Sequence, residues 1–158
     1  MSTVKKAGRL RAVEQPVITP LIGSLLRLPH EVMVGRIFES VQAHGFQVTL
    51  TELRVFLFPG PDGLRPAELS RRCNMTRQAM NYVLASLENQ DLIERRDGPD
   101  LATRVVHLTD RGWRLIGQIR ECVATVEGEW AALLGKRRME DLRQTLHELS
   151  VQLGKIDR

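Results

Sequence analysis

The segment from Pro66 to Asp110 constrains the fold most, because it joins two short helical patterns, a turn and a basic hairpin in one stretch of chain. Pro66 suits the first position of a helix, where a backbone N–H has no intrahelical partner. The polar pair Cys73-Asn74 ends that helix, and Thr76 is placed to cap a second one with its side-chain oxygen. This order predicts a winged helix-turn-helix in a mostly α-helical chain with a small β-hairpin.

The predicted second helix has an apolar face and a polar face. One face carries apolar residues at the i, i+3, i+4, i+7 spacing of a buried stripe, namely Met80, Val83, Leu84 and Leu87. The opposite face carries small, amide-bearing and phenolic side chains, namely Gln78, Asn81, Tyr82 and Ala85. Such a face fits the DNA major groove, where Gln and Asn pair with the N6/N7 edge of adenine. We expect Gln78, Asn81 and Tyr82 to contact bases or phosphates; a solvated face is the less favoured interpretation.

The hairpin after this helix is predicted from two short strands, Leu92–Arg96 and Arg104–Leu108. The residues between them, Asp97-Gly98-Pro99-Asp100, favour a loop over a helix. Three arginines lie near its tip, namely Arg95, Arg96 and Arg104. A basic hairpin at this place is typical of a wing, and we expect its arginines to reach a phosphate or the minor groove.

Charge alone does not identify this chain as a DNA-binding protein. The formal net charge is +4, but Pro66–Asp110 holds six arginines against seven acidic residues, so the segment has a net charge of −1. Any DNA affinity must therefore come from where the arginines lie. Thr76 and Arg77, at the start of the second helix, are expected to contact DNA, with Arg77 directed to a phosphate. For Arg71 and Arg72, phosphate contact and a solvated surface are equally good interpretations.

The chain before the motif is expected to begin with a disordered basic tail, residues 1–15, because this stretch is charged and almost free of large apolar residues. Apolar residues at helical spacing then run from Pro20 to Phe46. Pro29 interrupts them, which predicts either one kinked helix or two helices in series. Thr49 or Thr51 is placed to cap a further helix, which ends at the turn-forming residues 59–63.

The chain after the hairpin is predicted to form two more helices, and Thr109 is placed to cap the first, long one. The last helix carries an apolar seam at 3, 4, 3, 4 spacing, namely Met139, Leu142, Leu146, Leu149 and Leu153. Burying five such side chains contributes about 8–15 kcal/mol before entropy costs, so we expect the seam to be covered. The N-terminal helix, with Leu21 and Leu25, and a second copy of the chain are the expected cover. A homodimer is therefore predicted.

Composition limits the other function classes. The 158 residues fit one domain, and Cys73 and Cys122 are too few and too far apart for a zinc cluster. The four histidines show no metal-ligand spacing, so neither a metal nor a cofactor is expected. No catalytic motif stands out, so no catalytic residues and no enzyme activity are expected. Because there is no membrane-length apolar run and no signal peptide, the protein is expected to be soluble and cytoplasmic, without a membrane partner.

Two pieces of the chain carry a resemblance to a known family: TRQAMNYVLASLENQDLIERR, residues 76–96, and RVVHLTDRG, residues 104–112. From Pro20 to Leu153 the chain resembles the multiple-antibiotic-resistance regulator (MarR) family of bacterial winged-helix transcription factors. The resemblance implies an obligate homodimer, joined by its N- and C-terminal helices, on a pseudo-palindromic double-stranded DNA operator. It also implies a repressor whose DNA affinity is lowered by a small aromatic or anionic effector, bound between the dimer helices and the DNA-binding lobe.

The resemblance also implies how the chain is divided. A single MarR-type domain is expected over residues 16–158, with a winged helix-turn-helix lobe at 48–110 and dimerisation helices at 16–47 and 111–158. His30, Arg36 and Trp113 are candidate effector contacts.

The wing departs from the family pattern at its tip, where the family usually has an Asp followed two positions later by an Arg. Here Asp100 is followed by Ala102. Either other wing arginines replace the missing one in the minor groove, or the wing touches only phosphates. Two functions from other classes stay open: a module whose exposed helix binds a partner protein, and a thiol-based oxidant-sensing regulator that acts through Cys73.

Overall fold

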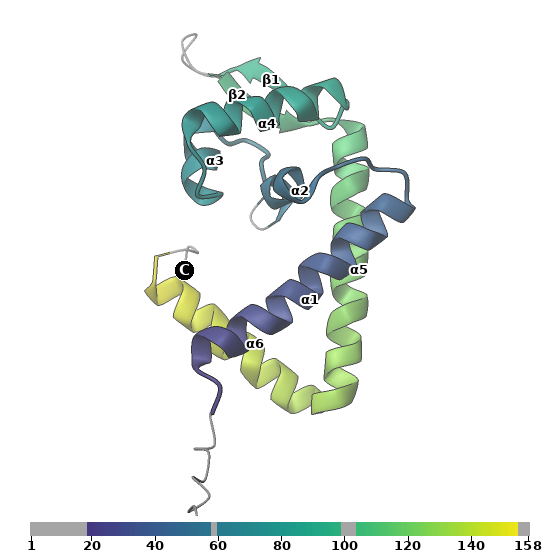
Figure 1. Cartoon of the computed structure of the whole chain (residues 1–158), viewed down its shortest axis with the longest axis vertical. Coiled ribbons are helices and arrows are strands. Elements are labelled where there is room, and N and C mark those ends of the chain that lie inside the picture. The colour runs from purple at the N-terminus through teal and green to yellow at the C-terminus, as the bar shows by residue number, and fades with distance from the viewer. Residues whose placement is uncertain (1–18, 58–59, 99–103, 155–158) are drawn as a thin grey trace, which may run out of the picture.

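The computed structural model describes residues 19–57, 60–98 and 104–154 of the chain. Within these residues it has six α-helices and one antiparallel hairpin, in the order α1 Ile22–Ala43, α2 Leu50–Phe56, α3 Pro66–Arg72, α4 Arg77–Asn89, β1 Ile93–Asp97, β2 Arg104–Leu108, α5 Asp110–Leu134 and α6 Lys136–Gln152. Helix α5 is a long column (Figure 1). The hairpin and α2–α4 lie at its upper end, α1 crosses it, and α6 folds back from its lower end. The fold is therefore the expected mostly helical winged helix-turn-helix; the predicted tail at residues 1–15 lies outside the described residues.

Two expectations about the N-terminal half were open and are decided by the structure. The apolar stretch forms one helix, α1, that continues through Pro29. Thr49, not Thr51, caps α2, because the Thr49 side chain accepts a hydrogen bond from the Glu52 backbone N–H at 3.2 Å. The Glu52 carboxylate in turn accepts from the Thr49 backbone N–H at 2.7 Å, which completes a capping box.

The helix-turn-helix follows from local signals in the sequence. Pro66 opens α3, and Asn74 adopts a left-handed conformation, with φ of 52°, in the turn that follows. Thr76 accepts a hydrogen bond from the Ala79 backbone N–H at 3.1 Å and so caps α4. The two strands pair from Ile93 opposite Leu108 to Asp97 opposite Arg104, close to the predicted bounds.

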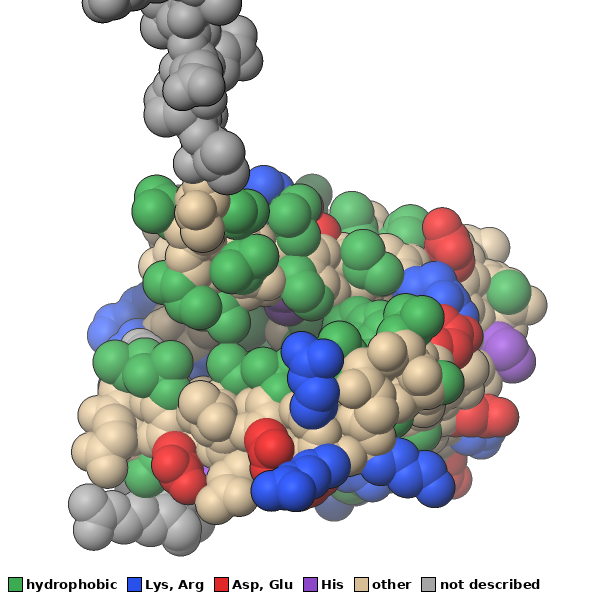
Figure 2. Space-filling view, turned by 90° about the horizontal axis from the view of Figure 1, so that it is seen from below, with side chains coloured by type: hydrophobic (Ala, Val, Ile, Leu, Met, Phe, Trp, Pro, Cys, Tyr) green, Lys and Arg blue, Asp and Glu red, His purple; other side chains and the backbone are tan. Residues whose placement is uncertain are grey.

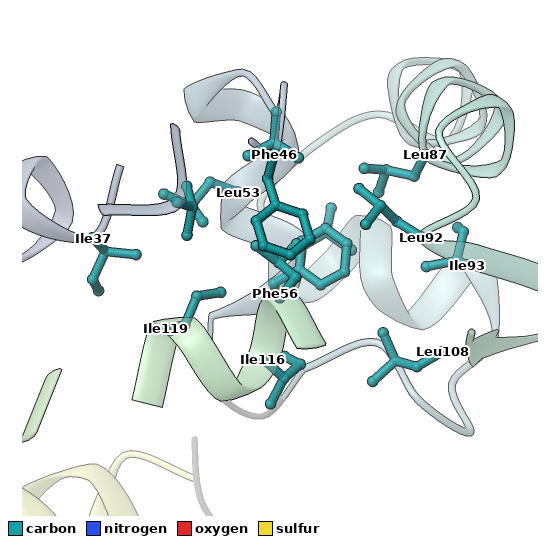
Figure 3. Packing of buried hydrophobic residues seen from close by; sticks show 14 of the residues in the cluster. Ile37, Phe46, Leu53, Phe56, Leu87, Leu92, Ile93, Leu108, Ile116 and Ile119 are labelled. Atoms are coloured by element: carbon teal, nitrogen blue, oxygen red, sulfur yellow. The ribbon is translucent and has the colours of Figure 1, made fainter. Parts of the chain in front are cut away.

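One continuous hydrophobic core holds the lobe to the long helix. The rings of Phe46 and Phe56 lie near its centre (Figure 3). Leu87, Leu92, Ile93 and Leu108 lie on the hairpin side of these rings, and Ile37 and Ile119 lie on the side of α1 and α5. Because these side chains are buried together, the helix-turn-helix and the hairpin share one core with α5.

The start of α5 packs against the chain just before the hairpin. Thr109 caps α5 by accepting a hydrogen bond from the Gly112 backbone N–H at 3.0 Å, and its hydroxyl donates to the Asp91 carbonyl at 2.6 Å. A Cβ on Gly112 would lie 2.0 Å from the Leu92 carbonyl oxygen. This close approach requires glycine at the position.

The apolar residues of α6 and of the first turns of α1 lie outside the core. No side chain of α6 is buried, and the predicted seam is open along its length, with Leu153 63% exposed. Leu21, at the N-cap of α1, is 79% exposed, and Leu133 near the end of α5 is 82% exposed. Figure 2 shows these hydrophobic side chains on both sides of a hollow on the underside of the molecule. Among the described helices, none has the length and apolar character needed to cross a bilayer.

Candidate nucleic-acid interface

Helix α4 presents the two faces that its sequence predicts. Met80, Leu84 and Leu87 are fully buried, and Val83 is half-buried. Gln78, Asn81, Tyr82 and Ala85 are exposed, and Tyr82 is 83% exposed. Large aromatic side chains are seldom left in water without a role, so this face is available for a partner.

A buried carboxylate, which the sequence interpretation missed, fixes α4 in place. Glu52 of α2 accepts hydrogen bonds from the Ser86 hydroxyl of α4 at 2.5 Å and from the amide of Gln90, the residue after α4, at 3.2 Å. Burial raises the pKa of Glu52, but the hydrogen bonds from Ser86, Thr49 and Gln90 outweigh it and hold the pKa below its usual value. The spacing Thr49-x-x-Glu52, a capping-box pattern, was the signal available in the sequence.

Three of the predicted DNA-binding arginines are engaged within the protein. Arg95 of β1 is half-buried and donates to the Glu88 carboxylate of α4 through its Nε at 2.9 Å. This hydrogen bond raises the pKa of Arg95 and lowers the pKa of Glu88. Arg72 pairs with Glu68 at 2.7 Å, and Arg96 pairs with Glu94. Arg95 therefore ties the hairpin to α4. A contact between Arg95 and DNA stays a prediction.

The other candidate arginines face solvent. Arg71 and Arg77 are exposed at the end of α3 and the start of α4, and within the described part of the chain neither makes an ion pair. Arg104 is exposed at the open end of the hairpin and lies close enough to Glu88 to help lower its pKa. The predicted wing tip, with Asp100 and Ala102, lies outside the described residues. Arg71, Arg77 and Arg104 are thus the arginines most available to phosphates.

Comparison with known proteins identifies this arrangement. A sequence model of the MarR family matches residues 46–100, from the end of the first inter-helix loop through the recognition helix and into the wing. The structure is similar to that of the Mycobacterium tuberculosis MarR family protein Rv2887 in complex with salicylic acid, at 26% identity and a TM-score of 0.62 over 83% of this chain and 97% of that one. Over residues 46–100 the chain is therefore similar to the MarR family.

Two further structures similar to this protein contain DNA. One is the transcriptional repressor CouR bound to a 23-mer DNA duplex, with 22% identity, 82% of this chain and 92% of that chain covered, and a TM-score of 0.62. The other is Rv2887 of Mycobacterium tuberculosis in complex with DNA, with 24% identity, 83% and 98% covered, and a TM-score of 0.61. No curated protein sequence matches the chain. With its family and fold, the protein is a winged-helix DNA-binding transcriptional regulator.

The predicted effector contacts His30, Arg36 and Trp113 lie at different places along α1 and α5, and their role stays a prediction. Arg36 of α1 makes a two-pronged pair with Glu129 of α5, at 2.9 and 3.0 Å. The hydrogen bonds that Arg36 donates to the Glu129 carboxylate raise the pKa of Arg36. Trp113 lies 16 residues before Glu129 on the same helix, about 24 Å along its axis. His30 lies further toward the N-terminus of α1 and is exposed. The sequence showed three plausible side chains but not the crossing of α1 and α5 that separates them.

A different, apolar pocket of about 380 Å³ lies between α2 and α5. Its apolar walls are Phe56, Leu57, Ile116, Ile119, Val123 and Ala124. Two charged residues also line it, but Glu127 is paired with Arg143 of α6 at 2.8 Å. Arg120 makes no ion pair within residues 19–57, 60–98 and 104–154, so its charge is available to a ligand.

The two cysteines of this protein are buried or half-buried. Cys73 is half-buried after α3, with its thiol 3.8 Å from the Arg54 carbonyl oxygen. Burial raises the pKa of Cys73, and the opposing effect of the Arg54 charge is smaller. Cys122 is buried in the core. A raised thiol pKa lowers the thiolate fraction, so nothing here favours the oxidant-sensing alternative. The described residues include no group of three His, Cys, Asp or Glu side chains that could hold a metal.

Proposed function

We propose that this protein is a homodimeric repressor that binds a pseudo-palindromic operator and is released by a small aromatic or anionic effector. The observation that carries the proposal is the exposed face of α4, which presents Gln78, Asn81 and Tyr82. Near the start of this helix lie Arg71 and Arg77, which make no ion pair with any residue that the structure describes. In this proposal residues 48–110 form the DNA-binding lobe.

The recognition of DNA divides between side chains of different chemistry. Gln78 and Asn81 are suited to base edges, because amide groups pair with adenine in the major groove. Thr76, Arg71 and Arg77 surround the start of α4 and are placed for phosphates, which fix the register of the helix on the duplex. The DNA complexes of CouR and Rv2887, which share the fold, support DNA as the partner of this lobe.

The homodimer is supported by apolar surface that one chain leaves in water. Met139 is half-buried, and Leu142, Leu146, Leu149 and Leu153 are exposed along α6. Leu21 and Leu25 are exposed at the N-terminal end of α1. Figure 2 shows hydrophobic side chains on both sides of one hollow on the underside of the molecule. Exposed apolar surface of this extent is typical of an interface. A second copy that inserts its own α1 and α6 covers both rows and makes residues 16–47 and 111–158 the dimerisation helices.

The effector is proposed to bind in the apolar pocket between α2 and α5. Its walls suit an aromatic ring, and Arg120 suits a carboxylate. The salicylic acid complex of Rv2887, a relative at 26% identity, supports this ligand class. Phe56 and Leu57 belong to the DNA-binding lobe, and the other walls of the pocket belong to α5. A ligand that fits one position of the lobe relative to α5 better than another therefore favours one spacing of the two α4 helices in the proposed dimer.

Sedimentation of a matched pair of variants tests the dimer. Leu149→Glu places a charge in the apolar seam, whereas Gln144→Glu places the same charge on the opposite side of α6. We expect the wild type and Gln144→Glu to sediment as dimers and Leu149→Glu to dissociate and lose operator binding. A wild type that is monomeric at micromolar concentration, or a dimer that Leu149→Glu leaves intact, contradicts the proposal.

A further inference from the structure

Two connections tie the DNA-binding lobe to the rest of the chain, and they touch each other. The loop between α1 and α2 contains Gly45 and Phe46, and the junction between β2 and α5 leads to Arg111. The Arg111 guanidinium lies over the Phe46 ring, 5.4 Å from its centroid, and its Nη2 is 3.5 Å from the Gly45 carbonyl oxygen. The Arg111 Nε is buried and has no hydrogen-bond partner within the described residues.

A hollow of about 300 Å³ opens beside this contact. It is lined by His44, Phe46, Arg111, Arg114 and Gln118. His44 and Gln118 also line a second, more polar hollow of about 390 Å³ further along the crossing of α1 and α5, so the two are continuous. The first hollow therefore lies where the loop before α2 meets the start of α5.

The lining of the first hollow carries positive charge that the protein does not neutralise. Arg111 and Arg114 make no ion pair within the described part of the chain, and no acidic residue lines this hollow. Two arginines without ion pairs around one hollow are an arrangement that binds anions elsewhere in proteins.

The other polar groups of the hollow are held in place by Ser40 of α1. The Gln118 amide donates to the Ser40 hydroxyl at 3.0 Å. The His44 Nδ1 donates to the Ser40 carbonyl oxygen at 2.8 Å, because a carbonyl oxygen can only accept. The walls are thus preorganised, which reduces the entropy cost of binding.

We propose that this hollow is a binding site for a small polar anion, a carboxylate or a phosphate, held by Arg111 and Arg114. This hollow is separate from the apolar pocket, because Gln118 and Arg120 are two positions apart on α5. Two positions turn the helix by about 200°, so the two side chains leave it in directions about 160° apart. An anion here bridges the loop before α2 and the first turns of α5, and so restrains the lobe relative to the long helix. The site is independent of whether the apolar pocket binds an effector.

Residue-resolved NMR tests the site in the intact protein. Backbone amides are followed while inorganic phosphate or, in a second series, acetate replaces chloride at constant ionic strength. In the wild type we expect amides near residues 44–46 and 111–118 to shift and saturate with at least one of the two anions. Arg114→Gln should weaken binding at these amides by about tenfold or more, the loss expected for one charge-assisted hydrogen bond. Arg138→Gln, which removes an exposed charge from α6, is the matched control and should bind as the wild type does.

The outcomes separate this site from other basic surfaces. Shifts at the DNA-binding face near residues 71–78 serve as an internal reference and should be the same in all three proteins. A response to phosphate but not acetate, or the reverse, supports the site and identifies the ligand class. If the amides at 44–46 and 111–118 respond to neither anion, or respond equally in Arg114→Gln and the wild type, the proposal is wrong.

Discussion

Substituting Gly112 with alanine tests how the long helix is joined to the DNA-binding lobe. The new Cβ would lie 2.0 Å from the Leu92 carbonyl oxygen and 2.9 Å from the Leu108 side chain. A carbonyl in the backbone cannot rotate away as a side chain can, so the first turn of α5 must move. Overpacking of this kind costs about 1–3 kcal/mol. The movement also weakens the Thr109 cap, worth about 1 kcal/mol. The helix preference of alanine over glycine returns about 1 kcal/mol, so we expect a net loss of about 1–3 kcal/mol.

The same helix offers matched controls. Gly117 and Gly128 are exposed, and an added Cβ at either meets nothing within 4 Å. Gly117→Ala and Gly128→Ala should therefore stabilise the protein by up to about 1 kcal/mol. Urea unfolding, followed by circular dichroism at one protein concentration, measures all three. If Gly112→Ala is as stable as Gly117→Ala, the close approach to Leu92 does not constrain the fold and the reasoning is refuted.

Three further predictions concern the lobe and its ligand. Hydrogen bonds hold the pKa of Glu52 below the ordinary 4.5, so the stability that the carboxylate contributes is present above that value and is lost as pH falls through the folded-state pKa. Glu52→Gln should lower the free energy of unfolding at pH 7 and make that free energy fall less between about pH 6 and 3. If urea unfolding shows the same fall at low pH in Glu52→Gln as in the wild type, the hydrogen-bond network does not act as described. Asn81→Ala should cost about 1–3 kcal/mol on operator DNA and little on random DNA, whereas Arg71→Ala should weaken both alike, as measured by fluorescence anisotropy; equal losses for both variants on both DNAs would remove the base-reading assignment. Arg120→Gln should weaken salicylate binding by about tenfold or more in calorimetry, while Arg138→Gln should not; unchanged affinity in Arg120→Gln would exclude the pocket as the carboxylate site.

The elements of the lobe could be predicted from the sequence, because local signals define them. Pro66 at the first position of α3, the Thr76 cap of α4 and the Thr109 cap of α5 are each decided within four residues of chain. The buried stripe of α4 follows from helical periodicity alone. The same reasoning left α1 undecided at Pro29, because a proline in a helix is tolerated or not according to the packing around it.

What the sequence did not show depends on contacts between distant segments. The pairing of Arg36 with Glu129 joins residues 93 positions apart, so no local pattern in the sequence indicates it. Arg95 was assigned to DNA from its place in a basic hairpin, but its partner Glu88 becomes visible only when β1 packs on α4. The apolar pocket likewise needs Phe56 and α5 to be brought together. Single-sequence patterns give faces and caps, whereas such pairings come from the packed structure.

The central claim is that α4 reads DNA as one of two symmetric copies. Selection of bound sequences from a pool of random DNA duplexes by the purified protein tests it most directly. The structure predicts enrichment of a pseudo-palindrome whose half-site centres lie one helical turn apart, about 34 Å. Alanine at both Gln78 and Asn81 should abolish this enrichment while leaving binding to the pool. No enrichment by the wild-type protein, or enrichment of a single asymmetric site, would contradict the claim and favour a protein partner for the exposed face of α4.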